Sequence, residues 1–226
     1  DPDFLCITGG SAGGHLSSLA ALTANDPAFQ PGFESVDTRV NACVPFYGVF
    51  DFIDRAGNRP LGGMDDTLGP LVFKCTAQEN QELWDSVSPV VRVHAEAPPF
   101  LVIQGSHDSL VMAEEADTFV AALREKSAQP VLHAELAGAQ HAFEIFNSPR
   151  TEHAVRAAAT FLDRIRVSRR LDAWRPSLPR WADGKSHRSC VRCWRIDSRW
   201  PFRQGLKSRA RNSRFLVCPS APTINW

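Results

Sequence analysis

Three residues far apart in the sequence, Ser11, Asp108 and His141, are of the types that together make a serine hydroxyl reactive. A serine hydroxyl is a poor nucleophile unless a neighbouring base takes its proton, and a third group must hold that base in one tautomer. Imidazole suits the second role and a carboxylate suits the third. The residue types therefore predict acyl transfer through a serine, provided that the fold brings the three together.

Ser11 lies in the sequence G-G-S-A-G, which has the G-x-S-x-G pattern of a nucleophile elbow. In such an elbow, a sharp strand-to-helix turn lifts the serine Oγ clear of the sheet. We expect Gly9 and Gly13 to be required because a Cβ at either position would collide with the crowded turn. The alternatives are a tight turn with a capping serine and a phosphate-binding glycine loop. No G-K-[ST] follows the glycines, which argues against a P-loop.

Asp108 and His141 each come soon after an apolar run of strand length, Phe100–Gln104 and Val131–Leu136. The carboxyl ends of parallel strands meet at one edge of a sheet, where open α/β sheets place their sites. We therefore expect the Asp108 carboxylate to orient the His141 imidazole. The alternatives are a helix-capping aspartate and a hydrogen-bonded loop histidine.

Strand-like and helix-like segments alternate over residues 1–166, which predicts an α/β fold with a mostly parallel sheet covered by helices on both faces. The predicted strands are Asp3–Thr8, Val40–Tyr47, Phe100–Gln104 and Val131–Leu136, and the predicted helices are Gly13–Ala24, Glu114–Ser127 and Thr151–Arg166. The irregular residues 46–97 are interpreted as an excursion above the sheet that walls a substrate pocket. The alternative is a packed surface insertion.

The motifs G-G-S-A-G-G at 9–14, G-S-H-D at 105–108 and Q-H-A-F at 140–143, with D-P-D-F at the start, resemble the α/β-hydrolase carboxylesterases of the hormone-sensitive-lipase-like branch. The resemblance covers residues 1 to about 166. It implies that Ser11 is the nucleophile, His141 the general base and acid, and Asp108 the orienting carboxylate. It also implies hydrolysis of carboxylic esters without a metal or cofactor.

The same family carries an H-G-G-G-type loop ahead of the nucleophile, whose backbone N–H groups line the oxyanion hole, and nothing precedes Asp1 in this sequence. We therefore expect residues 1–166 to form an incomplete α/β-hydrolase sheet that lacks its N-terminal strands, in a truncated and impaired enzyme. The Ala12 N–H remains as an oxyanion donor. Gly10, His15 and Tyr47 are predicted to lie at the substrate-binding site, with packing as the alternative role of His15.

The composition changes abruptly near Val167. Residues 1–166 carry 11 Lys and Arg against 22 Asp and Glu, whereas residues 167–226 carry 14 against 3 and hold five of the six tryptophans. We favour non-selected sequence, such as translation past a frameshift, in a disordered basic tail. The alternatives are nucleic-acid binding by the arginines and tryptophans and a zinc site. Its ligands would be His187, Cys190, Cys193 and Cys218.

Partners and compartment follow from composition and from the resemblance. No apolar run reaches transmembrane length, and the cysteines form no disulfide framework, so a reducing, cytoplasmic compartment is the default. We expect a small-molecule ester as the partner, with no metal, no nucleic acid and no membrane span. The competing class is a catalytically inactive hydrolase-fold remnant or binding protein whose basic tail contacts nucleic acid.

Overall fold

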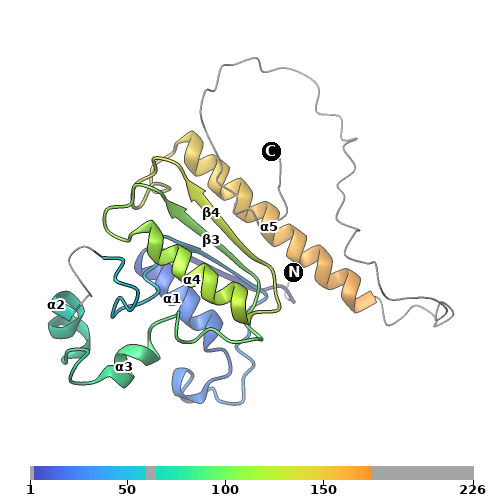
Figure 1. Cartoon of the computed structure of the whole chain (residues 1–226). Coiled ribbons are helices and arrows are strands. Elements are labelled where there is room, and N and C mark those ends of the chain that lie inside the picture. The colour runs from blue at the N-terminus through green and yellow to red at the C-terminus, as the bar shows by residue number, and fades with distance from the viewer. Residues whose placement is uncertain (1–2, 60–64, 175–226) are drawn as a thin grey trace.

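A four-stranded parallel sheet forms the centre of the computed structural model, which describes residues 3–59 and 65–174 (Figure 1). The strands lie in the order β1-β2-β3-β4. Their bounds are Cys6–Gly10 for β1, Ala42–Phe46 for β2, Phe100–Gly105 for β3 and Val131–Leu136 for β4. All four predicted strands are present, but β1 begins and ends later than predicted. Directly before β1, the Leu5 N–H donates to the Asn41 side chain at 2.6 Å instead of to the backbone of the neighbouring strand. The backbone pairing of β1 with β2 therefore begins at Cys6.

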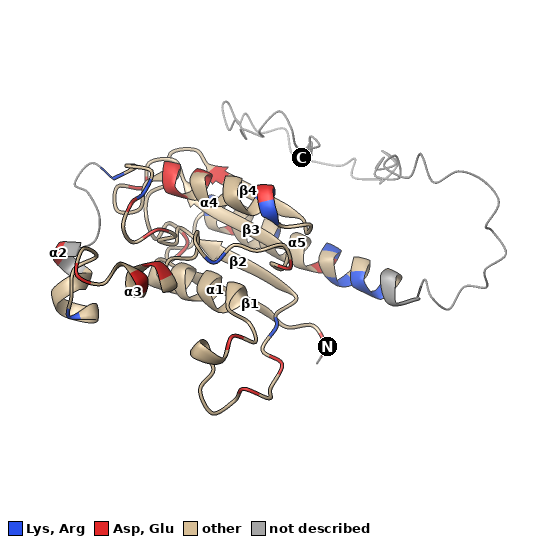
Figure 2. Ribbon diagram, turned by 60° about the horizontal axis from the view of Figure 1, so that its bottom comes forward, with Lys and Arg blue, Asp and Glu red and all other residues tan. Residues whose placement is uncertain are grey.

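Helices cover both faces of this sheet, as predicted (Figure 1). Helices α1 (Ala12–Leu22) and α4 (Ala113–Lys126) pack on one face, and α5 (Pro149–Trp174) packs on the other. The predicted last helix ended at Arg166, but α5 continues to Trp174, so residues 167–174 are helical rather than irregular. Figure 2 shows several Lys and Arg positions, in blue, along the ribbon of α5 toward its carboxyl end. Residues 175–226, which include the four ligands of the alternative zinc site, lie outside the described residues.

The two central strands, β2 and β3, are buried because their side chains alternate between two apolar cores. In β3, Phe100 and Val102 face the core formed with α1 and α4, whereas Leu101 and Ile103 face the core formed with α5. All four side chains are at most 4% exposed. Such two-sided burial fixes the register of the strand, and with it the position of the loop at its carboxyl end.

The segment between β2 and β3 forms a packed unit of its own. It contains α2 (Asp65–Leu68), the π-helical turn η2 (Gly69–Phe73) and α3 (Gln81–Ser86). Trp84 is fully buried against Val49, Phe52 and Val111. Because Val111 lies just beyond Asp108, the unit adjoins one of the loops of the predicted site. Its role as the wall of a substrate pocket stays a prediction.

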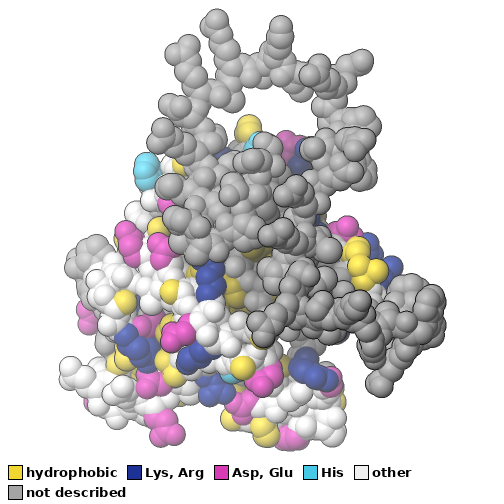
Figure 3. All heavy atoms as spheres, turned by 45° about the vertical axis from the view of Figure 1, so that its right-hand side comes forward, with side chains coloured by type: hydrophobic (Ala, Val, Ile, Leu, Met, Phe, Trp, Pro, Cys, Tyr) yellow, Lys and Arg dark blue, Asp and Glu magenta, His cyan; other side chains and the backbone are white. Residues whose placement is uncertain are grey.

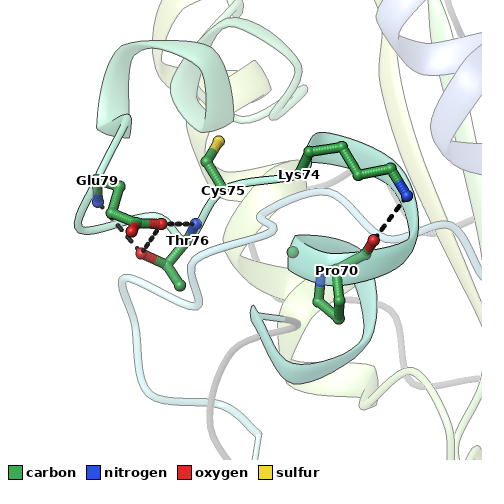
Figure 4. Close-up of a pocket in the computed structure, with 6 residues that line it drawn as sticks. Pro70, Lys74, Cys75, Thr76 and Glu79 are labelled. Carbon is green, nitrogen blue, oxygen red and sulfur yellow. Dashed lines mark hydrogen bonds between the residues drawn. The ribbon is translucent and has the colours of Figure 1, made fainter.

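A hollow of about 360 Å³ lies within this unit (Figure 4). It is lined by Gly69, Pro70, Lys74, Cys75, Thr76 and Glu79. The Lys74 ammonium turns back to donate to the Pro70 carbonyl at 2.8 Å, and Glu79 accepts from the Thr76 backbone and hydroxyl. These side chains therefore bond to other residues of the same unit. None of the three predicted catalytic residues lines the hollow.

The surface carries charges of both signs. Acidic and basic side chains are interspersed, with hydrophobic ones scattered among them, on the face seen in Figure 3.

Within residues 3–59 and 65–174, no helix is long and apolar enough to cross a bilayer. The same residues contain no cluster of three or more side chains able to hold a metal ion.

Candidate active site

Ser11 occupies a strained turn between β1 and α1. Its backbone has φ 56° and ψ −119°, a conformation that non-glycine residues rarely adopt and that typically costs about 1–3 kcal/mol. The turn is held in place because the Ser11 N–H donates to the Phe46 carbonyl, at the end of β2, at 3.0 Å. This is the strand-to-helix geometry that the glycine-rich motif predicted.

The glycines around the turn have different roles. A Cβ on Gly9 would lie 2.5 Å from the Gly13 carbonyl oxygen, and one on Gly14 would lie 2.6 Å from the Phe46 carbonyl oxygen. A Cβ on Gly13 would meet no atom within 4 Å beyond its own helix. The expectation that Gly13 avoids a collision is therefore wrong. The first turn of α1 approaches β1 and β2 closely, and Gly9 and Gly14 point into these contacts whereas Gly13 does not.

His141 lies between the other two predicted residues. Its Nε2 is 2.8 Å from the Ser11 Oγ, and its Nδ1 is 2.7 Å from the Asp108 Oδ2. A carboxylate can only accept, so in the neutral imidazole Nδ1 carries the hydrogen and Nε2 is free to accept the hydroxyl proton of Ser11. The structure thus brings together all three residues in the arrangement that a serine nucleophile needs.

Asp108 is held by its own loop. Its side chain is fully buried, and its Oδ1 accepts the N–H groups of Leu110 and Val111, both at 2.9 Å. The Gln104 Nε2 donates to the Asp108 Oδ2 at 3.2 Å and to the Val111 carbonyl at 2.9 Å. These bonds fix the carboxylate toward His141. Sequence reasoning missed Gln104, although a polar side chain at the end of an apolar strand was a usable signal.

Ala12 is the first residue of α1, and its side chain is exposed. The N–H groups in the first turn of a helix have no partner within the helix, and the positive end of the helix dipole lies there. The Ala12 N–H belongs to the residue directly after Ser11. It is therefore well placed to stabilise a negative charge that develops next to Ser11.

The three residues predicted to bind substrate have different environments in the structure. Gly10 lies at the end of β1, directly before Ser11. His15 is buried, bonds through Nε2 to the Val87 carbonyl at 2.8 Å and packs on Phe52, so it joins α1 to the unit after β2. Burial lowers the pKa of His15, and the bond to Val87 opposes this shift. The Tyr47 side chain is only 2% exposed and is also enclosed by protein.

A sequence profile of the BD-FAE family matches residues 1–123, a region that includes Ser11 and Asp108. The chain belongs to the BD-FAE family. Over 165 residues, this BD-FAE chain is 52% identical to the probable carboxylic ester hydrolase LipM of Mycobacterium tuberculosis, covering 73% of this chain and 38% of LipM. Over 178 residues, it is 44% identical to the esterase LipQ of the same organism, covering 79% of this chain and 42% of LipQ.

The fold of the BD-FAE chain also has a close counterpart among solved structures. An acetyl ester-xyloside bifunctional hydrolase from Caldicellulosiruptor lactoaceticus superposes with a TM-score of 0.59 at 21% identity, covering 73% of this chain and 58% of that one. With the mycobacterial relatives, this confirms the predicted α/β-hydrolase carboxylesterase resemblance. The chain spans about two fifths of the length of LipM and LipQ.

Proposed function

We propose that this chain hydrolyses carboxylic esters through a catalytic triad of Ser11, His141 and Asp108. The observation that carries the proposal is the pair of hydrogen bonds made by the His141 imidazole, 2.8 Å to the Ser11 Oγ and 2.7 Å to the Asp108 Oδ2. The names of LipM and LipQ support an ester as the substrate.

The proposed reaction begins when the Ser11 Oγ attacks the ester carbonyl carbon while the His141 Nε2 takes the hydroxyl proton. Asp108 keeps the imidazole in the required tautomer and stabilises its protonated form. The Ala12 N–H donates to the oxyanion of the tetrahedral intermediate. His141 then protonates the leaving alcohol, which leaves an acyl group on Ser11. A water molecule, deprotonated by His141, attacks this acyl-enzyme and releases the acid.

A fluorophosphonate probe tests the proposal because it labels an activated serine covalently. We expect the 226-residue chain to be labelled and Ser11→Ala to be unlabelled. Asp108→Asn holds the imidazole in the wrong tautomer, so labelling is expected to slow by a factor of about 10⁴. Ser109→Ala, an exposed serine on the loop after β3, is the matched control and should be labelled at the normal rate.

Two results would contradict this function. Labelling that persists in Ser11→Ala would assign the reactive hydroxyl to another residue. A folded chain that takes up no probe would favour the inactive hydrolase-fold remnant. Circular dichroism of each variant separates loss of folding from loss of reactivity. Turnover of p-nitrophenyl acetate then establishes whether the acyl-enzyme is hydrolysed.

A further inference from the structure

A tyrosine–carboxylate contact lies beside the proposed triad. The Tyr47 hydroxyl, at the carboxyl end of β2, donates to the Glu144 Oε1. Glu144 comes three residues after His141 on the same loop. The Tyr47–Glu144 pair therefore connects the end of β2 to the loop that carries the proposed base. Sequence reasoning missed Glu144, whose signal was one acidic residue in the apolar stretch H-A-F-E-I-F.

The Tyr47 ring packs directly on the imidazole. Its centroid lies 4.6 Å from that of His141, with 56° between the ring planes, and 5.8 Å from that of Phe143 in an edge contact. A Cβ on Gly10 would lie 2.7 Å from the Tyr47 hydroxyl and 3.0 Å from the Glu144 Oε1. The pair thus fills the space between the residue before Ser11 and the imidazole. Gly10 leaves room for the pair.

Three of the six described non-glycine residues with positive φ lie around the same contact. Ser11, Tyr47 and Ala142 all have positive φ, at 56°, 36° and 58°. Such conformations persist where the surrounding structure holds them. The hydrogen bond from Tyr47 to Glu144 connects the two segments that carry the second and third of these residues. It therefore restrains the loop on which His141 must keep its position.

The charge of Glu144 also bears on the imidazole. Within the described residues Glu144 makes no ion pair, and its Oε2 is buried without a hydrogen-bond partner. Burial raises the pKa of Tyr47, and the bond to Glu144 and the charges of Glu144 and Asp108 raise it further. Two further charged or titratable side chains belong to neighbouring segments: His107 is exposed on the loop after β3, and the Arg150 guanidinium lies against Gly138.

We propose that Tyr47 and Glu144 are positioning residues for His141. Tyr47 holds the imidazole between Ser11 and Asp108 through ring packing and through its bond to the His141 loop. Glu144 holds Tyr47, and its negative charge stabilises the imidazolium that forms when the base takes the serine proton. This inference rests on the proposed function, since it concerns the base of the same site.

Two conservative variants of the full chain separate these roles. Glu144→Gln keeps an oxygen that can accept from Tyr47 but removes the charge. We expect the acidic limb of the pH profile of Ser11 labelling to move to lower pH by about 0.5 to 1 unit, because the imidazolium loses a stabilising charge. The nitrogen NMR signals of the His141 ring should also shift, since the charge beside the ring is lost. Tyr47→Phe keeps the ring but removes the hydroxyl, and labelling should slow about tenfold because the base is less well placed.

Glu125→Gln is the matched control, since it removes an exposed carboxylate from α4, and it should leave both measurements unchanged. A pH profile and imidazole NMR signals that are both unchanged in Glu144→Gln, or a normal labelling rate in Tyr47→Phe, would overturn the inference. The NMR measurement needs no catalysis. If the wild-type chain resists the probe while Glu144→Gln shifts the imidazole signals, the proposed function fails and the positioning role stands.

Discussion

At the scale of single residues, the site depends on where side chains are absent. Ser11 adopts a strained conformation where α1 approaches the strands closely, and the carbonyl oxygen of Gly13 lies only 2.5 Å from the place that a Cβ of Gly9 would take. The two glycines of the motif are therefore not equivalent, although the sequence pattern treats them alike.

Gly9→Ala and Gly13→Ala form a matched pair that tests this difference. The first places a Cβ against backbone, and we expect the free energy of unfolding to fall by about 1–3 kcal/mol. The second fills open space in a helix, where alanine is favoured over glycine by up to about 1 kcal/mol. Its stability should be unchanged or raised. Urea denaturation measures both, and equal losses in the two variants would contradict the proposed contact.

At the scale of elements, a buried ion pair fastens the segment after β2 to the first turn of α4. The Glu115 carboxylate lies 2.8 Å from the Arg59 guanidinium, with side chains 3% and 10% exposed. Glu115 Oε1 also accepts the N–H groups of Phe50 and Asp51, at 2.6 Å and 3.1 Å. Burial raises the pKa of Glu115, and Arg59 opposes this shift. The pair thus sets where the chain leaves β2, just beyond Tyr47.

Removing one partner of this ion pair leaves the other charge buried and uncompensated. We expect Glu115→Ala to lower the free energy of unfolding by about 3–5 kcal/mol. Glu114→Ala is the control, because the neighbouring carboxylate is exposed and its loss should change stability by no more than about 0.5 kcal/mol. Similar urea midpoints for the two variants would show that the pair does not fasten the segment.

At the scale of the whole molecule, the buried His15 and the largely buried His133 make stability depend on pH. His15 joins α1 to the unit after β2, and His133 lies in β4 beside Asp117. Burial lowers the pKa of both, against the opposing effects of Val87 on His15 and of Asp117 on His133. The unfolded chain therefore binds protons at these positions at a higher pH than the folded chain does. Folding stability is lost as the pH falls from about 6.5 toward the folded values.

Urea denaturation between pH 7.5 and pH 5.5 tests this coupling. We expect the free energy of unfolding to decrease below about pH 6.5, by at most about 1.4 kcal/mol per pH unit for each histidine. The double variant His15→Gln, His133→Gln should show a flatter dependence. His153→Gln, an exposed histidine on α5, should retain the wild-type slope. A slope that the double variant leaves unchanged would assign the effect to other groups.

The alternation of strands and helices was predictable, because the apolar runs of β2, β3 and β4 and the helical spacing in α1 and α4 are local properties. The end of α5 was not, since its final turns continue into a segment whose basic composition does not suggest a helix. Glu144 escaped prediction because it acts through a contact with Tyr47, 97 residues earlier in the sequence. Gln104 escaped prediction although its partners Asp108 and Val111 lie only four and seven residues further along the chain.

The sequence by itself determined that a serine, an aspartate and a histidine each come after a strand, and strand ends are where a parallel sheet gathers its loops. Only the tertiary structure decided that the His141 Nε2 lies 2.8 Å from the Ser11 Oγ, across 130 residues of chain. That distance depends on strand order, on the close approach of α1 to the sheet and on buried contacts around both loops. No local preference of the chain encodes these long-range contacts.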